Sequence, residues 1–487
     1  MSAVGIDWAA FFAWLTLMMH WGIIIGLGFR IVTKRRPTGV SLAWLTVIAT
    51  LPFVGAVVYL LVGELWLAGF RVRRARSLGD QKRARLRELR VESEAHIGVS
   101  SGPAQALDAY ASHGLGVPTL AGNRVDLYPE ADQAFEAMVR DIDNARRRCL
   151  LLFYIWSCGG RADAVGEALI RAARRGLECR VLLDAVGSRP FFGCDLDRRM
   201  REAGVQVREA LPVGRLRSVL ARIDLRNHRK IMSIDGRVGY CGSLNLADPK
   251  FFKIRKGPWV DMIARVEGPA AEALELIVQQ DWWVEQGQEG GKPFEDVNIG
   301  AYRPGEVPIQ VVSSGPGQTP RATHDMLLTL VYAATRELII TTPYFIPSEP
   351  MENALIGAAR RGVRVSLVLP DKVDSLMVKH ASRAYYQELL DEGIEIRLFR
   401  NGLLHAKTMS ADGSVCMFGS ANIDRRSFDV NFETTMFIYD EGVTAQLVAL
   451  QRSYMDRSVR VDREAWSRRG VHRRLIEGAA QLASPLL

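Results

Sequence analysis

A polar motif that occurs twice constrains this chain more than any other feature. Residues 228–245 and 405–422 both read His, any residue, Lys, four residues, Asp, six residues, Gly, Ser, any residue, Asn. Identical spacing over this many fixed positions points to one shared task rather than to chance. The matched pairs are His228 and His405, Lys230 and Lys407, Asp235 and Asp412, Gly242 and Gly419, Ser243 and Ser420, and Asn245 and Asn422.

The spacing predicts that each copy forms a β-hairpin. Residues two apart in a strand point to the same face, so the histidine and the lysine of each copy project together. Asp-Gly pairs at 235–236 and 412–413 lie between apolar-rich runs, which is typical of a tight hairpin turn. The serine and the asparagine lie two apart on the returning strand. Each hairpin therefore gathers an imidazole, an ammonium, a hydroxyl and an amide on one surface.

Two such surfaces supply what phosphodiester exchange requires. One neutral imidazole can attack phosphorus, while the other, as imidazolium, protonates the departing alkoxide. Lysines and amides can hold the non-bridging oxygens. Because a single copy lacks either the nucleophile or the proton donor, we expect His228 and His405 to meet in one cleft.

The sequence around the motifs is also duplicated. Two predicted strands flank an amphipathic helix within 149–184, and 337–370 repeats that order. The pentapeptide AARRG ends the helix in both halves, at 172–176 and 358–362, and the two motifs lie 177 residues apart. The pattern predicts an α/β fold built from two sheet-plus-helix units that pack face to face.

Residues 1–70 favour a membrane location. The stretches 8–29 and 41–63 contain 22 and 23 residues without Asp, Glu, Lys or Arg, and each is long enough to cross a bilayer. They predict a transmembrane hairpin, with two buried core helices as the alternative. The basic stretch 71–90 follows, and it either contacts anionic headgroups or forms a solvated linker helix.

The orientation of this hairpin is less constrained. Basic clusters at 34–36 and 71–76 fall on opposite sides of the membrane if both segments span fully. Pro52 and Gly55 interrupt the second segment, so a re-entrant hairpin can put both clusters on the cytoplasmic side. We favour a cytoplasmic catalytic region, because the larger basic run precedes it.

Charge and cysteine usage add weaker constraints. The net charge of +9 favours an anionic partner, either nucleic acid or a membrane surface. The six cysteines contain no C-x-x-C pair, so we expect neither a zinc ribbon nor a disulfide framework, and a reducing compartment is the simpler interpretation. Neither H-E-x-x-H nor a P-loop occurs, and we expect no metal and no cofactor.

The paired motifs resemble those of the phospholipase D superfamily. Over nearly its whole length the chain resembles the bacterial cardiolipin synthases, through PFVGAVVYLLVGE, FYIW, GSLNLADPKFF, PWVDMIARVEGP, TTPYFIPSE, GLLHAKT and the terminal SPLL. The resemblance implies a multi-pass enzyme of the bacterial inner membrane that joins two phosphatidylglycerol molecules into cardiolipin and releases glycerol. We divide the chain into a membrane hairpin (1–70), a basic helix with a linker (71–120), and two phospholipase D-like units (121–304 and 305–487).

The resemblance also implies roles for individual residues. His228 attacks the donor phosphate to form a phosphatidyl-histidine, and His405 protonates the leaving glycerol and then deprotonates the acceptor hydroxyl. Asp261 and Glu433 accept hydrogen bonds from the catalytic histidines and orient them. The catalytic group further includes Lys230, Lys407, Asp235 and Asp412, although the turn positions of the two aspartates favour structural support. The substrate phosphate is expected at Ser243, Asn245, Ser420 and Asn422.

Three other functions fit the same motifs. The chain could be a hydrolytic phospholipase D, a membrane-tethered phosphodiesterase or nuclease, or a lipid-binding scaffold without catalytic activity. The apolar segments favour anionic phospholipids (phosphatidylglycerol and cardiolipin) and the membrane as partners over nucleic acid. The donor lipid, phosphatidylglycerol or phosphatidylethanolamine, is open from the sequence, as are the acyl-chain preference and the oligomeric state.

Overall fold

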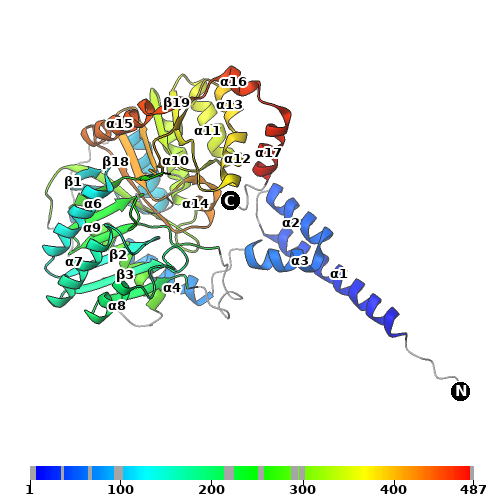
Figure 1. Cartoon of the computed structure of the whole chain (residues 1–487), viewed down its shortest axis with the longest axis horizontal. Helices are drawn as coiled ribbons and strands as arrows, with labels where there is room; N and C mark the ends of the chain where they lie inside the picture. The colour runs from blue at the N-terminus through cyan, green and yellow to red at the C-terminus, as the bar shows by residue number, and fades with distance from the viewer. Residues whose placement is uncertain are drawn as a thin grey trace. The chain divides into compact units, whose positions relative to one another are not determined.

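The structure is a computed structural model, and it describes most of the chain in two compact units. One unit comprises residues 1–68 with 213–224, and the other comprises 69–212 with 225–487 (Figure 1). The described residues are 7–34, 38–63, 69–92, 102–212, 224–249, 257–286, 294 and 302–482.

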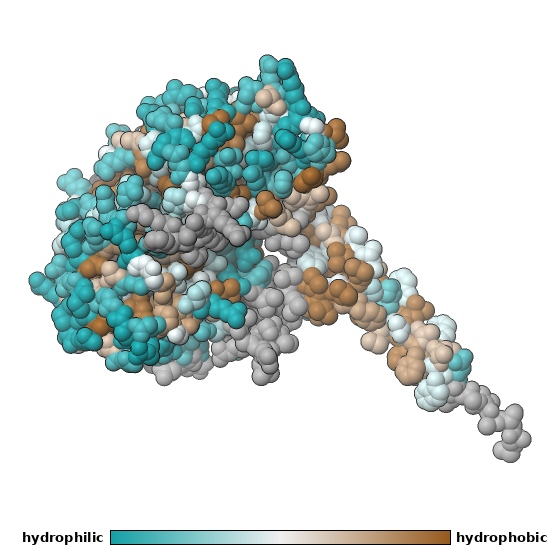
Figure 2. Space-filling view, in the orientation of Figure 1, coloured by the Kyte–Doolittle hydropathy of each residue, from teal (hydrophilic) through white to brown (hydrophobic). Residues whose placement is uncertain are grey.

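Within the residues described above, the first unit contains one helix long and apolar enough to cross a membrane, α1 (Trp8–Thr33). The Asp7 carboxylate caps it by accepting hydrogen bonds from the backbone N–H groups of Ala9 and Ala10. Apolar side chains lie exposed along this unit (Figure 2), which is unusual for a surface that faces water. These exposed side chains fit an association with lipid.

The predicted second spanning helix is interrupted. Helix α2 (Thr38–Thr50) ends before Pro52, and α3 (Pro52–Val58) and a π-helical turn, η1 (Tyr59–Gly63), follow. A Cβ atom on Gly55 would lie 2.8 Å from the carbonyl oxygen of Val47, so α3 folds back against α2 instead of continuing its axis. The second apolar segment is therefore interrupted at the Pro52 and Gly55 positions noted in the sequence, because proline removes a helical N–H and glycine permits the close approach. The membrane hairpin stays a prediction.

The second unit contains a duplicated α/β sheet, as predicted. The strand order of its first half, read from the outer edge inward, is matched by that of its second half. The first half runs β4 (Gln206–Ala210), β3 (Glu178–Asp184), β2 (Arg148–Phe153), β5 (Ile231–Ile234), β6 (Val238–Gly242), β8 (Ile263–Glu267) and β1 (Leu120–Tyr128). The second runs β13 (Glu395–Phe399), β12 (Arg364–Pro370), β10 (Glu337–Thr341), β15 (Thr408–Ala411), β16 (Val415–Gly419), β18 (Glu433–Ile438) and β9 (Val307–Ser314), with β19 (Ser458–Arg460) added beyond β13.

The sheets of the two halves join at one edge. Strands β1 and β9 pair antiparallel, so one continuous 15-stranded sheet crosses the whole unit. The buried Asn123 holds this junction, because its amide donates to the carbonyl oxygens of Leu120 and Val307 and accepts from the N–H of Ala270. Away from this junction the inner faces of both halves contribute to one buried cluster, for example through Leu152 of β2 and Ile339 of β10, as the predicted face-to-face packing requires.

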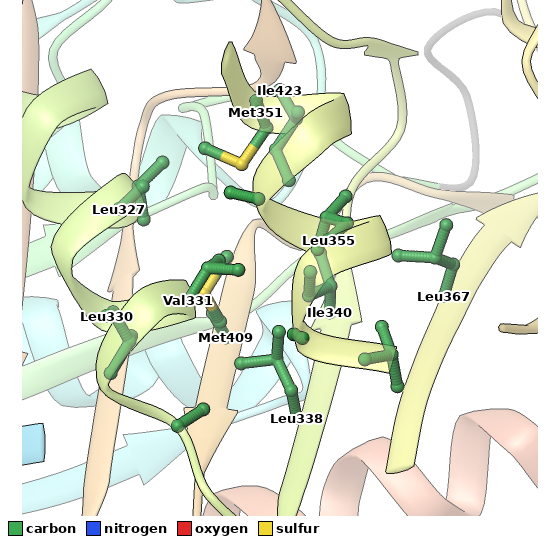
Figure 3. Packing of buried hydrophobic residues seen from close by; sticks show 14 of the residues in the cluster. Leu327, Leu330, Val331, Leu338, Ile340, Met351, Leu355, Leu367, Met409 and Ile423 are labelled. Atoms are coloured by element: carbon green, nitrogen blue, oxygen red, sulfur yellow. The ribbon is translucent and has the colours of Figure 1, made fainter. Parts of the chain in front are cut away.

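Apolar side chains fill the space on both faces of the sheet. Along β2, Leu150 and Leu152 belong to one cluster and Leu151 and Phe153 to another, as alternation requires. The first cluster includes α9 (Pro269–Gln286) and α15 (Glu441–Asp456); on the other face α6 (Ala131–Asp143), α7 (Asp163–Arg174) and α8 (Asp195–Glu202) cover the first half. Helices α10 (Ala322–Ala333), α11 (Glu349–Arg360) and α12 (Leu376–Ala384) cover the second half in the same way (Figure 3).

The basic stretch after the apolar segments forms α4 (Gly69–Glu92), which packs within the second unit. Leu78, Leu86 and Leu89 lie on one face of this helix and belong to the same buried cluster as α9. The interpretation as a fully solvated linker helix is therefore excluded. Most of its basic side chains are exposed or half-buried, whereas that of Lys82 is buried.

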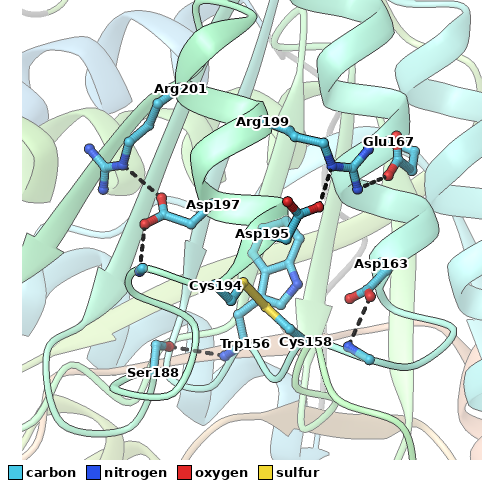
Figure 4. Close-up of a disulfide and its surroundings, with 12 residues drawn as sticks. Trp156, Cys158, Asp163, Glu167, Ser188, Cys194, Asp195, Asp197, Arg199 and Arg201 are labelled. Carbon is cyan, nitrogen blue, oxygen red and sulfur yellow. Dashed lines mark hydrogen bonds and ion pairs between the residues drawn. A yellow bond between two sulfur atoms is a disulfide. The ribbon is translucent and has the colours of Figure 1, made fainter.

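A disulfide joins Cys158 to Cys194, where the sequence predicts none (Figure 4). It connects the segment after β2 to the residue before α8. Ser188 makes a second tie between the same segments, since its hydroxyl donates to the carbonyl oxygen of Tyr154 and accepts from the N–H of Trp156. The other four cysteines are buried thiols. A separation of 36 residues carries no recognisable spacing pattern, which explains the wrong prediction.

Candidate active site

Both motifs form the predicted hairpins. Strands β5 and β6 pair antiparallel around Asp235-Gly236, and β15 and β16 pair around Asp412-Gly413. The two aspartates have φ angles of 55° and 54°, in the left-handed region that the turn requires. The histidine of each motif lies just before the first strand of its hairpin.

Backbone hydrogen bonds attach each motif to the opposite half of the unit. The N–H of His228 donates to the carbonyl oxygen of Phe432 at 2.9 Å, and that of His405 donates to Val260 at 2.8 Å. Strand β7 (Trp259–Val260) from the first half also pairs parallel with β14 (Leu403–Leu404) from the second. The two motifs, far apart in the sequence, are therefore brought to one junction.

The acids that contact the histidines are exchanged between the halves. His228 Nδ1 lies 3.0 Å from both carboxylate oxygens of Glu433, which belongs to the second half. His405 Nδ1 lies 2.6 Å from Oδ1 of Asp261, which belongs to the first half. When Nδ1–H donates to a carboxylate, Nε2 carries the lone pair. The sequence located both acids, but it did not show that each serves the histidine of the other half.

The two lysines lie buried beside the histidines. Lys230 Nζ donates to the carbonyl oxygen of His228, and Lys407 Nζ to that of His405, each at 2.6 Å. Burial lowers the pKa of Lys230 to about 7 although Glu433 opposes it, and the charge of Lys407 lowers it further. Burial lowers the pKa of Lys407 to about 8, against the attraction of Asp261 and Glu433. Groups from both halves thus share one electrostatic environment.

Burial and the neighbouring charges favour neutral imidazoles and ionised acids in this site. Burial lowers the pKa of His228 to about 4, more than Glu433 raises it, and burial also lowers the pKa of His405. Burial opposes ionisation of Glu433 and Asp261, yet the neighbouring histidines and lysines lower the pKa of both acids. A neutral imidazole whose Nδ1–H is held by a carboxylate is suited to nucleophilic attack through Nε2.

Two aromatic side chains fix the imidazole rings, and the sequence did not single them out. Tyr154 packs edge-on against His228 with ring centroids 4.9 Å apart, and Lys230 Nζ lies 5.2 Å from the centre of the same tyrosine ring. Trp259 stacks on His405 at 4.6 Å. The available signal was the FYIW and PWVD stretches, where an aromatic residue stands close to a strand end or to an acid.

The motif serines are engaged by backbone. Ser243 Oγ donates to the carbonyl oxygen of Met262 and accepts from its N–H, directly beside Asp261. Ser420 Oγ does the same with Thr434, beside Glu433. These hydroxyls therefore hold the segments that present the two acids.

The motif asparagines keep unused hydrogen-bonding atoms. Asn245 Oδ1 accepts from the N–H of Ile155, whereas its Nδ2 is buried without a partner among the described residues. Asn422 Oδ1 is likewise buried and unpartnered within that part of the chain. Buried polar atoms are normally satisfied, so these two atoms are suited to a ligand.

The motif aspartates lie at the other end of their hairpins and do not face the histidines. Asp235 accepts hydrogen bonds from the N–H groups of residues 146–148, each at 2.8 Å. Asp412 accepts from the N–H groups of residues 335–337 and from the Thr335 hydroxyl. Their inclusion in the catalytic group is corrected, because each carboxylate ties its turn to the segment that leads into the neighbouring strand.

Replacing Asp412 should lower stability more than activity. We expect Asp412→Ala to lower the free energy of unfolding by about 2–3 kcal/mol, because backbone donors lose their acceptor and alanine disfavours a positive φ. Asp412→Asn should lose less, since asparagine keeps an acceptor oxygen and tolerates this conformation. Denaturant unfolding of the detergent-solubilised chain measures the change, with the exposed Asp456→Ala as control. A large loss of turnover per folded molecule would contradict the structural role.

Among the residues that the structure describes, no three His, Cys, Asp or Glu side chains are grouped so that they could hold a metal ion.

The duplicated sheet and the paired histidines define a phospholipase D-like catalytic core. The family model of the cardiolipin synthase phospholipase D-like domain matches residues 138–282 and 327–454, and that of the phospholipase D-nuclease N-terminal segment matches 22–64. Cardiolipin synthase A of Yersinia pestis and that of Yersinia pseudotuberculosis serotype O:1b (strain IP 31758) are each 42% identical over 479 residues, 98% of both chains. The chain belongs to the cardiolipin synthase family.

A solved structure supports the fold independently of close sequence similarity. The phosphatidylserine synthase of Haemophilus influenzae Rd KW20 superposes with a TM-score of 0.58 at 14% identity, covering 78% of this chain and all of that one. At this identity the likeness concerns the architecture alone. It agrees with the duplicated α/β unit seen here.

Proposed function

We propose that this protein transfers a phosphatidyl group from one phosphatidylglycerol to the primary hydroxyl of another, forming cardiolipin and releasing glycerol. The observation that carries the proposal is the crossed pairing of His228 with Glu433 and of His405 with Asp261, which needs both halves for one site. The relatives named cardiolipin synthase A cover nearly the whole chain and supply the substrate class.

In the first step, Nε2 of His228 attacks the phosphorus of the donor lipid. A P–N bond forms, the P–O bond to glycerol breaks, and His405 gives the proton of its Nε2 to the departing alkoxide. In the second step, His405 takes the proton of the acceptor hydroxyl, whose oxygen attacks phosphorus as the P–N bond breaks. Water in place of the acceptor would yield phosphatidate, the hydrolytic alternative.

The environments of the two histidines support this division of roles. Because burial lowers the pKa of His228 to about 4, this imidazole stays neutral and ready to attack at neutral pH. His405 must be protonated in the first step, and an anionic phosphate entering the site favours its imidazolium, which Asp261 also stabilises.

We assign the phosphate oxygens to the two lysines and to the free Nδ2 donor of Asn245. The free Oδ1 of Asn422 accepts hydrogen bonds, so it suits a hydroxyl of the lipid glycerol rather than the phosphate. A diester anion would give each buried ammonium a charged partner in addition to the backbone carbonyl to which it donates. Ser243 and Ser420 instead position the acids. Asp235 and Asp412 stabilise the hairpins and take no part in the chemistry.

Lysine titration should appear in substrate binding. The pKa is about 7 for Lys230 and about 8 for Lys407, so the site loses positive charge as pH rises through this range. We expect KM for the lipid to rise above pH 8. The bound phosphate raises both pKa values, so kcat should fall only at higher pH. Initial rates in mixed micelles across this range test it, and a pH-independent KM would contradict it. Lys407→Arg, which keeps its charge, should move the rise of KM to higher pH.

We further propose that residues 1–70 anchor the enzyme in the bacterial inner membrane. In this division the linker segment ends at residue 120, and the first phospholipase D-like unit ends at residue 304. Helix α1 would span the bilayer, and the broken α2–α3 segment would make the chain multi-pass or re-entrant, with the catalytic unit in the cytoplasm. Such tethering keeps the site at the interface, where the acceptor lipid is concentrated. Nucleic acid is not a partner in this scheme.

Product analysis tests the proposed function directly. Purified protein is incubated with phosphatidylglycerol alone, and the lipid products are resolved by mass spectrometry with free glycerol measured in parallel. We expect cardiolipin and glycerol in equal amounts. Phosphatidate without cardiolipin would identify a hydrolase, and a requirement for added phosphatidylethanolamine would change the donor. Cleavage of labelled DNA would favour the nuclease alternative.

A further inference from the structure

A cavity lies on helix α4, apart from the paired histidines. Its volume is about 300 Å³, ten times the space of one water molecule in the liquid and within the range of small-ligand sites. Helix α4, helix α9 and the end of β9 form its walls. Its polar lining includes Arg76, Asp80, Lys82, Arg83, Gln280 and Gln318.

Lys82 is a buried cation in this cavity. Only 7% of the residue is exposed, and its ammonium donates to Ser313 Oγ at 3.0 Å. No second acceptor for it is seen among the described residues, although an ammonium has three donors. Burial lowers the pKa of Lys82 to about 7, and the charge of Arg229 adds to this effect while Asp281 opposes it. A buried ammonium in these surroundings is stabilised by an anion that enters the cavity.

Gln280 supplies an unused acceptor in the same wall. Its Nε2 donates to the carbonyl oxygen of Ala75, whereas Oε1 is buried and has no partner within the described chain. The free Oε1 of Gln280 and the Lys82 ammonium line the same cavity. Together they suit a ligand that carries both a hydroxyl donor and a phosphate. Arg76 and Arg83 add positive charge from the exposed side of α4, and Arg83 is also paired with Asp80.

The cavity lies behind the first motif rather than within the catalytic site. Arg229 stands between His228 and Lys230, so its side chain turns to the opposite face. There it donates to the Asp281 carboxylate and to Oε1 of Gln318. Gln318 also lines the cavity, so that the buried Arg229 network separates the two sites while touching both.

We propose that this cavity is a second lipid site, which binds the phosphoglycerol headgroup of an anionic phospholipid through Lys82 and Gln280. Lipid is favoured over free phosphate because α4 follows the apolar N-terminal residues directly in sequence. Leu86, Ile277 and Val311 also give the cavity an apolar wall that a free anion would not use. The site binds a headgroup whichever histidine is the nucleophile.

Four variants of the full-length chain test the site. Lys82→Gln removes the ammonium, and Arg73→Gln removes one charge from the exposed face of the same helix as a matched control. Gly79→Leu fills the cavity without changing any charge, because a Cβ there would lie 3.6 Å from Gln280 Nε2 and a longer side chain extends inward. Gly79→Ala is its control, since that distance is an ordinary contact.

Binding is measured in a His228→Ala background, which prevents turnover, by calorimetric titration of the detergent-solubilised protein with dihexanoyl phosphatidylglycerol. We expect Lys82→Gln and Gly79→Leu each to bind one lipid fewer, or to weaken one class of sites at least about tenfold. Arg73→Gln and Gly79→Ala should bind as their parent does. Equal binding by Lys82→Gln and Arg73→Gln would overturn the proposal. If Lys82→Gln does not fold, the comparison of Gly79→Leu with Gly79→Ala gives the answer instead.

A parallel titration with inorganic phosphate distinguishes the two sources of the anion. We expect the step that depends on Lys82 to be at least about tenfold weaker for phosphate than for the lipid. Equal affinities would assign the cavity to free phosphate and overturn the lipid site. Failure of the catalytic proposal would instead show as missing cardiolipin in the unmodified protein, which these binding measurements do not use.

Discussion

His228→Ala is expected to abolish phosphatidyl transfer, with a loss of at least about four orders of magnitude in kcat. The variant removes the atom to which the phosphatidyl group is transferred, and no other described imidazole contacts Glu433. His405→Ala should be similarly severe with phosphatidylglycerol, because the glycerol alkoxide then leaves without a proton. Cardiolipin formation by each purified variant measures the loss. The exposed His472→Ala should retain full activity.

An activated donor separates the two histidines. When p-nitrophenol replaces glycerol in the donor lipid, the leaving group departs as a stable anion and needs no general acid. His405→Ala should then release one equivalent of nitrophenolate in a rapid burst, and the phosphatidyl-enzyme should accumulate. His228→Ala should show no burst. The reverse pattern would exchange the roles of the two histidines. A burst in both variants would show that neither histidine is required as the nucleophile.

The sequence predicted the hairpins and their residues because the motif is local. Strand alternation and an Asp-Gly turn fix how His228 and Lys230 project before any tertiary contact forms. The duplication was visible for the same reason, since each unit repeats its own local pattern. The acids were recognised by their similar distance from the motifs.

Contacts between segments far apart in the sequence could not be predicted in this way. The pairing of β1 with β9 depends on which edges the folded halves leave open, and the contact of Glu433 with His228 joins residues 205 positions apart. The disulfide and the packing of α4 on α9 likewise result from tertiary contacts. The break at Pro52 was noted in the sequence, but its outcome depends on how closely Gly55 approaches Val47.

The exchange of acids between the halves leads to the second large effect. Glu433→Gln is expected to lower kcat by about two to four orders of magnitude, although Glu433 lies in the half that carries the other histidine. A carboxamide can donate its N–H₂ to Nδ1 of His228, which places the proton on Nε2 and removes the attacking lone pair. The neutral carboxamide also no longer stabilises positive charge on the His228 ring. Cardiolipin formation measures the loss, and the exposed Glu441→Gln is the matched control.

The activated donor shows which histidine each acid serves. Glu433→Gln should slow the nitrophenolate burst, because that burst reports attack by His228. Asp261→Asn should preserve the burst and slow the transfer to the acceptor hydroxyl, which needs His405 as base. If each acid instead served the histidine of its own half, Asp261→Asn would remove the burst and Glu433→Gln would spare it. Because both variants keep the size of the original side chain, a difference between them reports proton placement rather than a cavity.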